Sequence, residues 1–505
     1  MANSDIYTHE KILAHADSST TPSTLESSEG PVFDAARTKK LLRKMDWHLV
    51  PFLALLYLLS FLDRTNIGNA RLANLEADLG MKGLNYNVAL AVFFPWYVLA
   101  EVPSNIMMKK TRPSLWLTII MLAWGIVMTL MGTVTSYHGL LVCRMALGIA
   151  EGGLFPGVTF YITMWYQRHE CGLRMAIFFS AATLAGAFGG LLARGIVQMD
   201  GVGGKPGWAW IFILEGLITV IVACIAYWAI NDYPETAKFL TPEEKTEVQR
   251  RLKADRTSLA DEYDIKYFFH AIKDWKIYVH MVITIGIYTP LYSFSVFLPT
   301  IISTMASKRG GGVAFTKEQS QLYSVPPYVV ACLFTIAGGY LADKKSQRGI
   351  FMIFFCCLST LGFVLLISTD DPHVQYLGTF LAAAGIYPNV PMGVAWNGNN
   401  IGGSTKRGVG IAMHVGFGNL GGAIAAFAYR TVEKPRYYSG HGLLIATTTM
   451  SCFLCIFMTW YLRKENARRD ALMTEKGYTL ASYTDEMKET ERELGDNASF
   501  FRYTI

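Results

Sequence analysis

Arg144 and Glu151 are the only charged residues in the stretch from Gly139 to Tyr166, which is long enough to cross a lipid bilayer as one helix. About 20 apolar residues suffice for a span, because a helix rises about 1.5 Å per residue. The two residues are two helical turns apart and point to the same side. A charge at the bilayer centre costs about 2.5–3.5 kcal/mol, so each needs a partner or a watery cavity. This face therefore suits an ionic substrate and a proton, or else a structural ion-pair network between helices.

Small residues occur in the same stretch. Gly148, Gly152, Gly153 and Gly157 narrow the helix, which lets a neighbouring helix approach closely. Pro156 lacks a backbone N–H and permits a bend. We therefore expect this helix to pack tightly against its neighbours.

A second charged pair, Asp63 and Arg64, lies near the outer end of the first apolar run. The helical pattern continues past the pair, which indicates a position inside the membrane, although an interfacial anchor is the alternative. An apolar environment favours the neutral form of a carboxyl group, so Asp63 and Glu151 are candidates for proton coupling. A guanidinium stays charged and matches a carboxylate with two hydrogen bonds. Arg64 and Arg144 are therefore candidates for binding a substrate carboxylate, and the resting partner expected for Arg144 is Glu151 or Asp63.

Three further charged residues are assigned to gating. Glu101 lies roughly 12 Å along its helix from Lys109, so it either ties helix ends together or contacts the substrate. Asp343 and Arg348 flank the end of a later span. We expect them to latch neighbouring helix ends in one conformation.

The second half of the chain offers amide and aromatic groups for the face opposite Arg144. His414 also titrates near neutral pH in its ordinary state. Glu215 and Arg194 either pair with each other or face the cavity. The substrate-binding candidates of the second half are Tyr387, Asn389, His414 and Asn419, with Trp396 and Asn397 beside them.

The composition is that of a polytopic membrane protein, with 52% hydrophobic and only 17% charged residues. The net charge of +6 comes from short loops, so it indicates membrane orientation and no nucleic-acid partner. The eight cysteines lie nearly all in apolar runs, and no His or Cys pair completes a metal site. No P-loop, dinucleotide-binding or zinc-protease motif occurs. We expect no enzyme, no metal and no cofactor beyond a proton gradient.

The apolar runs predict an all-α membrane protein with twelve transmembrane helices in two pseudo-symmetric six-helix lobes. The first six spans cover residues 47–69, 86–108, 115–135, 139–166, 173–198 and 208–230. The second six cover residues 277–303, 320–342, 350–368, 374–396, 408–429 and 442–462. The expected organisation is a disordered basic N-terminus (1–44), a first lobe (45–230), a central loop (231–275), a second lobe (276–463) and a tail (464–505).

Lys and Arg gather in alternate loops and in the run just before the first span. By the positive-inside rule, both termini and the central loop are therefore cytoplasmic.

The two halves resemble each other. Ala150–Val158 aligns with Ala382–Val390 at an offset of 232, and the same offset places Gly189–Gly190 on Gly421–Gly422. A repeat of this kind is typical of a two-lobed transporter.

These motifs resemble the major facilitator superfamily and, within it, the fungal anion:cation symporters of the allantoate and nicotinate permease branch. The resemblance covers about residues 40–470. It implies coupling of proton entry to uptake of organic anions, with the proton on Asp63 and Glu151 and the anion on Arg64 and Arg144. The stretches concerned are Phe61–Ile67, Glu101–Asn105, Arg144 to Glu151, Trp210–Gly216, Asn231–Leu240 and Asn400–Arg407.

We therefore expect a monomeric, proton-coupled symporter that imports a small carboxylate across the plasma membrane by alternating access. Ser180–Gly190 is close to nicotinate permeases, so a nicotinate-like monocarboxylate is the first guess. One alternative is a proton antiporter that exports a metabolite or drug, but Ala185–Gly190 lacks the proline usual in such exporters. A non-transporting nutrient sensor is the second alternative, although the tails are short for one.

Overall fold

The computed structural model describes residues 33–505 except 168–169, 257–264, 306–315, 434–435 and 480–483. In these described ranges every regular element is a helix and no strand occurs. The predicted disorder of residues 1–32 lies outside the described residues.

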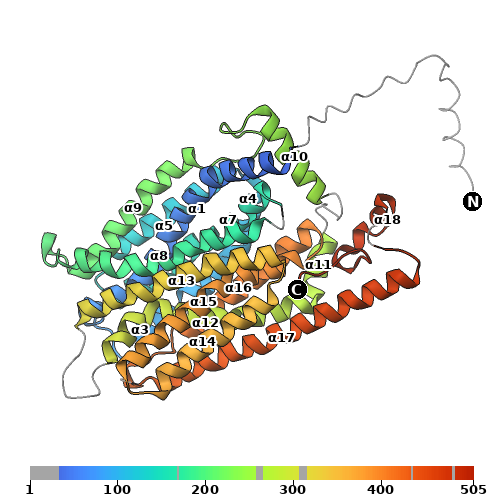
Figure 1. Ribbon diagram of the computed structural model, residues 1–505. Helices are drawn as coiled ribbons and strands as arrows, with labels where there is room; N and C mark the ends of the chain where they lie inside the picture. Colours follow the sequence, from blue (N-terminus) through green and yellow to red (C-terminus); the bar gives the residue numbers. More distant parts are fainter. Residues whose placement is uncertain (1–32, 168–169, 257–264, 306–315, 434–435, 480–483) are drawn as a thin grey trace, which may run out of the picture.

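The first half of the chain forms one lobe of long helices, drawn in blue to green in Figure 1. A short helix, α2 (Leu75–Asp78), lies in the loop after the first of them. The long elements are α1 (Ala35–Leu72), α3 (Asn85–Ala91) with α4 (Phe93–Lys110), α5 (Pro113–Met131), α6 (Tyr137–Glu151) with α7 (Leu154–Trp165), α8 (Cys171–Val197) and α9 (Gly207–Ala229).

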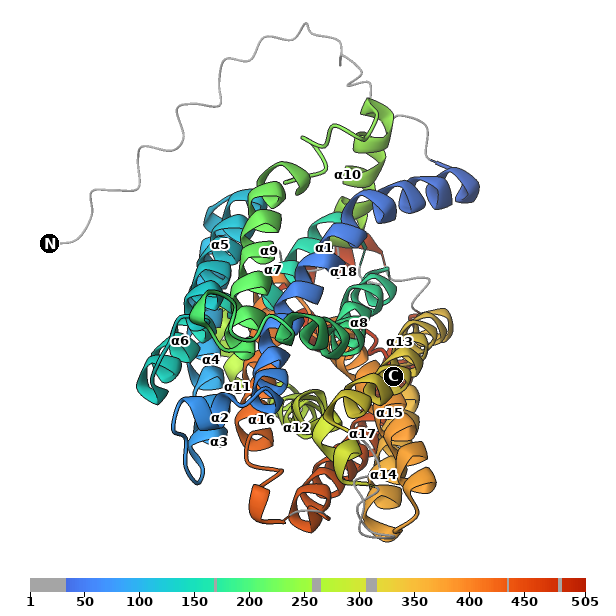
Figure 2. The same cartoon turned by 90° about the vertical axis from the view of Figure 1, so that its left-hand side faces the viewer.

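The second half forms the other lobe, drawn in yellow to red, and Figure 2 shows the two lobes side by side. The lobes meet mainly where α8 packs on α13 and where α4 packs on α16. The helices of the second lobe are α12 (Trp275–Thr304), α13 (Lys317–Lys345), α14 (Gly349–Ser368), α15 (Pro372–Asn399), α16 (Ser404–Ala425) and α17 (Tyr438–Glu475).

Eleven of these helical segments are long and apolar enough to cross a membrane. The twelfth long helix, α15, fills the remaining predicted span and packs against α13 and α14. The chain is therefore an all-α, multi-pass membrane protein with two six-helix lobes, as the sequence predicted.

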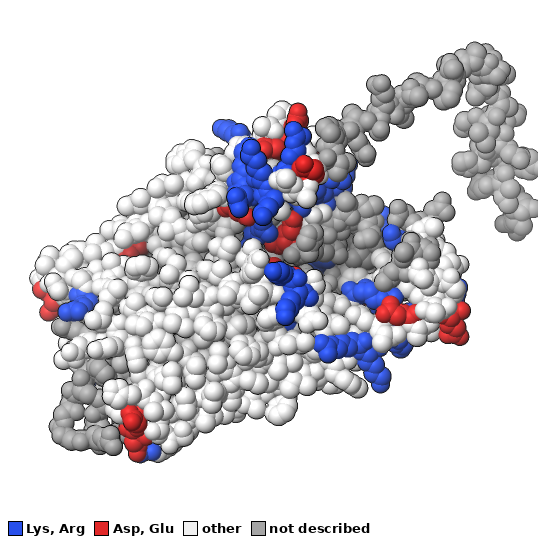
Figure 3. Space-filling model, viewed as in Figure 1, with Lys and Arg blue, Asp and Glu red and all other residues white. Residues whose placement is uncertain are grey.

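The side of the bundle in Figure 3 is almost free of charge, while Lys, Arg, Asp and Glu gather at its ends. Most lie at the end that carries α10 (Pro242–Arg256), α11 (Ile265–Lys273) and α18 (Asp485–Thr490). We call this the basic end and the other the opposite end. A charge-free belt is what the lipid hydrocarbon requires.

The span formed by α6 and α7 is interrupted near Pro156. Pro156 cannot donate to the carbonyl of Gly152, four residues earlier, and its ring crowds that carbonyl. The helix accordingly ends at Glu151 and restarts at Leu154 as α7. The predicted bend thus divides the span into two helices, and Glu151 is the last residue of the first.

The predicted disordered N-terminus, central loop and tail each contain helical residues. Residues 35–44, placed in a disordered N-terminus, form the first turns of α1. The central loop contains α10 and α11. In the tail, α17 continues to Glu475, and a 3-10 helix, η4 (Arg492–Asn497), follows α18. A search for membrane spans misses all three because they are too polar to cross a membrane, although each buries apolar side chains, among them Leu41, Val248 and Met473.

The glycines of α6 allow α4 to approach at backbone contact. A Cβ on Gly148 would overlap the carbonyl oxygen of Phe93, and one on Gly152 would overlap that of Tyr97. Gly157 is different, because a Cβ there would lie 3.5 Å from the Leu117 side chain.

Gly148→Ala is therefore expected to destabilise the protein, by about 1–3 kcal/mol as is usual for overpacking against backbone. The measurement is the thermal unfolding midpoint in detergent. Gly157→Ala is the matched control and should leave the midpoint unchanged. Equal midpoints for both variants would contradict the close approach of α4 and α6.

Candidate functional site

An ion pair between Arg64 of α1 and Glu151 of α6 lies at the centre of the site. Arg64 Nη2 donates to Glu151 Oε1, and the Ser60 hydroxyl donates to the same oxygen. Glu151 is fully buried and Arg64 is 5% exposed. The other oxygen of Glu151 has no hydrogen-bond partner. A buried carboxylate with one satisfied oxygen retains a position for a proton.

Aromatic rings of both lobes surround the Arg64 guanidinium. Its Cζ lies 5.2 Å from the Phe93 ring, 5.0 Å from the Tyr97 ring and 5.6 Å from the Tyr292 ring. Arg64 Nη1 donates to the Tyr292 hydroxyl at 2.8 Å, and that hydroxyl donates to Asn419 Oδ1 at 2.6 Å. Because Tyr292 belongs to α12 and Asn419 to α16, this chain of hydrogen bonds joins the two lobes.

Asp63 lies beside this cluster but has no cationic partner. Its Oδ2 accepts from Trp124 Nε1 at 2.8 Å and from the Thr219 hydroxyl at 3.1 Å, while its Oδ1 has no partner. Two neutral donors orient the carboxylate without neutralising it. Asp63 is thus oriented by neutral donors and forms no ion pair with the described residues.

Arg144 is the buried cation of the site that lacks a carboxylate. It is 2% exposed, its Nε donates to the Ala89 carbonyl at 3.3 Å, and its Nη1 has no hydrogen-bond partner. Its Cζ lies 5.4 Å from the same Phe93 ring that faces Arg64. The resting partner predicted from the sequence was Glu151 or Asp63. The structure differs, since Arg64 holds Glu151 and Arg144 forms no ion pair with the described residues.

A small cavity of about 20 Å³ lies between the two arginines and the second lobe. Such a volume holds a single water but no carboxylate substrate. Among its lining residues are Arg64, Arg144, Phe94, Tyr292 and Gly422. In this conformation the site therefore has too little room for a substrate carboxylate beside its cations.

The lobes touch on both sides of this cavity. Towards the opposite end, the Asn87 amide donates to the Ala426 carbonyl at 2.6 Å. At the basic end, Arg348 donates to Asp343 at 2.6 Å, and the Asp343 carboxylate packs on Gly172 at the start of α8. These contacts join the two lobes on both sides of the cavity.

Glu101 also lies between the lobes. It is 1% exposed on α4 and packs against Gly416 of α16, beside Asn419. Neither carboxylate oxygen meets a donor at hydrogen-bonding geometry. Glu101 thus contacts the other lobe, while the predicted tie to Lys109 involves a side chain outside the described part of the structure.

The remaining second-lobe candidates lie away from the cavity. Tyr387 shares a hydrogen bond with Ser295 at 2.8 Å, and Asn389 donates to the Gly385 carbonyl at 2.9 Å. His414 hydrogen-bonds Thr284 at 2.9 Å. Of the four residues predicted to face Arg144, Asn419 alone joins the cluster around Arg64.

The sequence left open whether Glu215 and Arg194 pair with each other or face the cavity. Glu215 accepts a hydrogen bond from the Asn66 side chain and is not paired with Arg194. Within the described parts of the chain, no group of three or more His, Cys, Asp or Glu residues is arranged to hold a metal ion.

Sequence reasoning missed Tyr292, Trp124 and Thr219, which contact the charged residues directly. Tyr292 had a detectable signal, since Tyr288 and Tyr292 are spaced by one helical turn in an otherwise apolar span. Trp124 and Thr219 had none, because a lone Trp or Thr in a span is ordinary packing.

The chain that carries this site is similar to known membrane transporters. The model of the Major Facilitator Superfamily matches residues 53–426. The MFS-type transporter cnsO of Penicillium expansum is 36% identical, over 94% of this chain and 92% of that protein. The high-affinity nicotinic acid transporter of Saccharomyces cerevisiae is 30% identical, over 86% of this chain and 80% of that protein. A bacterial homologue of the human lysosomal transporter Spinster, solved inward-facing and occupied, matches with a TM-score of 0.56 at 14% identity, over 85% of this chain and 98% of that one.

Proposed function

Because the chain belongs to the Major Facilitator Superfamily and is a membrane transporter, we propose that it imports a small organic anion together with protons by alternating access. The observation that supports this most is Arg144, a buried guanidinium that pairs with no carboxylate of the described residues and lines a small cavity. A guanidinium cannot deprotonate inside the membrane, so an anion from outside the chain is its natural ligand.

The Arg64–Glu151 pair supplies the coupling to protons. A proton on Glu151 removes the charge that holds Arg64, so two guanidinium groups then face the cavity. A substrate carboxylate that binds them competes with Glu151 and frees it to bind the proton. Each ligand therefore favours the other, because coupling between two bound ligands is reciprocal. Asp63, oriented by Trp124 and Thr219, is the second proton site.

The cluster also couples binding to lobe movement. The hydrogen bonds from Arg64 through Tyr292 to Asn419 cross from the first lobe to the second. A substrate held by the arginines and these groups favours closure of the lobes around it. Asp343 with Arg348 at one end, and Glu101 between α4 and α16, are the gating groups in this scheme.

The basic end faces the cytoplasm in this proposal, since positively charged loops stay on the cytoplasmic side. Both termini are then cytoplasmic, and the membrane is the plasma membrane. A nicotinate-like monocarboxylate is the first substrate to test, because the nicotinic acid transporter of Saccharomyces cerevisiae is a relative over most of both chains. Its aromatic ring would suit the Phe93, Tyr97 and Tyr292 rings around Arg64.

The test is uptake of a panel of labelled carboxylates, nicotinate among them, into cells that express the protein, at external pH 5 and pH 7.5. Uptake should be faster at pH 5 and should collapse with a protonophore, because protons enter with the anion. Cells that express Arg144→Ala are the background control, because their uptake measures the protonated acid that diffuses through the lipid without the transporter. Uptake that ignores both treatments, or that requires sodium, contradicts proton coupling, and accelerated efflux identifies an exporter.

A further inference from the structure

The C-terminal segment of residues 491–505 folds back onto the basic end of the second lobe. Trp396 Nε1 and the Asn400 amide each donate to the Thr504 carbonyl at 2.9 Å. The Thr504 N–H donates in return to Asn400 Oδ1 at 2.7 Å. These are side chains of α15 and of the turn after it, so the segment is bound at the mouth of the helix bundle rather than along its outside.

A buried charge cluster holds the middle of the segment. Asp496, 1% exposed, accepts from Lys276 of α12 at 2.6 Å and from Lys406 of α16 at 2.5 Å. Asp274 shares Lys406 at 2.7 Å. Two lysines and two carboxylates thus balance. Without Asp496, the two lysines would share the single carboxylate of Asp274, which leaves one positive charge without a partner in the cluster. The charge of Asp496 therefore complements the lobe on which the segment docks.

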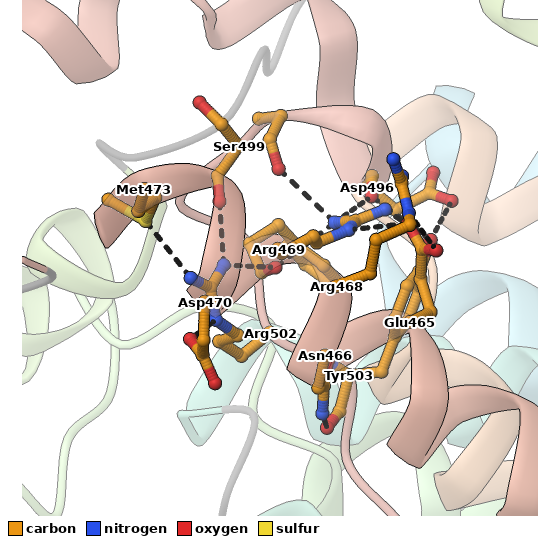
Figure 4. Close-up of polar contacts among 12 residues, drawn as sticks. Glu465, Asn466, Arg468, Arg469, Asp470, Met473, Asp496, Ser499, Arg502 and Tyr503 are labelled. Atoms are coloured by element: carbon orange, nitrogen blue, oxygen red, sulfur yellow. Dashed lines mark hydrogen bonds and ion pairs between the residues drawn. The ribbon is translucent and has the colours of Figure 1, made fainter. Parts of the chain in front are cut away.

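Arg469 of α17 binds the backbone of the same segment, as Figure 4 shows. Its Nη1 donates to the carbonyl oxygens of Asp496, Ala498 and Phe501 at 2.9, 3.2 and 3.0 Å. Its Nη2 donates to the Tyr503 hydroxyl at 3.1 Å. A guanidinium with four such acceptors fixes the shape of the segment as well as its position.

The end of the segment reaches the contact between the lobes. The Arg348 N–H donates to the Ile505 carbonyl at 2.6 Å, and the Arg348 guanidinium holds Asp343. The Asp343 carboxylate lies against Gly172 at the N-terminus of α8, where the helix dipole favours a negative charge. Arg348 therefore connects the end of the segment to Asp343, the residue that contacts α8.

We propose that residues 491–505 are an intramolecular lock, which docks on the second lobe and holds Arg348 and Asp343 in the position that closes the basic end against α8. Release of the segment frees the loop between α13 and α14 and lets the lobes part there. The lock sets how often the basic end opens, independently of which substrate the transporter carries.

The charge of Asp496 in the lock persists in the pH range where the transporter works. Burial raises the pKa of Asp496, but Lys276 and Lys406 outweigh it and hold the pKa below its ordinary value. A carboxylate with a lowered pKa in the docked state contributes its stability above the ordinary value, about 3.9, and loses it only as the pH falls further. The contribution of Asp496 to docking is therefore present throughout the range between pH 5 and pH 8.

The test uses Cys171, the first residue of α8 and the neighbour of Gly172, as a reporter of opening. The purified protein in nanodiscs, which expose both ends, is treated with a membrane-impermeant maleimide, and modification of Cys171 is followed by peptide mass spectrometry. A chain without residues 491–505 and the variant Arg469→Ala should both be modified at least about fivefold faster than the natural chain. Arg468→Ala is the matched control, since the hydrogen bonds and the ion pair of Arg468 go to Glu465 and not to the segment.

A synthetic peptide of residues 491–505, added to the shortened chain, should restore slow modification, and the same peptide with Asp496→Asn should not. Rescue separates a lock from a mere loss of folding, because an unfolded lobe cannot be rescued by a peptide. Unchanged modification of Cys171 in a folded, shortened chain would overturn the proposal. So would fast modification that the peptide fails to slow.

Discussion

Arg144→Lys is expected to weaken substrate binding by about 10- to 100-fold while the protein stays folded in the membrane. Lysine keeps the charge but loses the planar fork that makes two hydrogen bonds to a carboxylate. A hydrogen bond to a charged group contributes about 1.5–3 kcal/mol, and 1.4 kcal/mol corresponds to a factor of ten. Arg144→Ala should lose more. The measurement is the concentration at which unlabelled substrate competes for uptake.

Two controls accompany this prediction. The first is Arg71→Lys, which changes an arginine outside the cavity that pairs with Glu76 at 3.0 Å. This variant should leave the apparent affinity unchanged. The amide analogue of the substrate should fail to compete in the natural protein, since it lacks the negative charge. If Arg144→Lys and Arg144→Ala both transport with normal affinity, the anion is bound elsewhere, and Arg64 becomes the leading candidate.

Glu151→Gln is expected to abolish accumulation of substrate against a gradient while exchange of substrate across the membrane continues. Glutamine resembles a permanently protonated glutamate, so Arg64 is released but no proton can be carried. The measurement compares net uptake with exchange of labelled for unlabelled substrate in the same cells. Asp63→Asn should behave in the same way if the two acids share the proton.

Glu215→Gln is the matched control for Glu151→Gln. Glu215 is also a buried acid of the first lobe, but its partner is the neutral Asn66 side chain. It should therefore keep pH-driven accumulation. Full accumulation in Glu151→Gln would mean that Glu151 has only a structural role. This is the alternative of a structural ion-pair network between helices.

The sequence predicted the fold well, because membrane spans depend on local composition. Twelve apolar runs became twelve long helical segments, and the internal repeat separated them into two lobes. The helix ends were predicted less well. The basic residues 35–44 extend α1, because a helix that begins in water can continue into the membrane without a change of pattern.

The charged residues were predicted, but their pairing was wrong. A seven-residue spacing places Arg144 and Glu151 on one face, yet Arg64 from α1 takes Glu151. The break caused by Pro156 makes Glu151 the end of α6, and periodicity cannot anticipate which neighbouring helix fills that position. The partners Tyr292 and Asn419 come from the other lobe, so their contacts depend on tertiary packing.

The tail was missed for the opposite reason. Its polar composition is typical of a disordered segment, since it has too little apolar surface to form a core of its own. It is held by Lys276, Lys406 and Arg469, which lie 220, 90 and 27 residues before Asp496 in the sequence. Composition describes a segment in isolation and therefore cannot show what the rest of the chain offers it.

The two helices of the central loop belong to different lobes, and this sets a length on the covalent tether between them. α10 is fixed to the first lobe, where Lys44 pairs with Glu244 and Arg251 pairs with Glu170. α11 packs on α16 of the second lobe. α10 ends at Arg256 and α11 begins at Ile265, so eight residues, 257–264, separate them in the sequence, and eight residues of any chain span at most about 30 Å. In the proposed alternating access, this covalent link would limit how far the lobes can separate at the basic end.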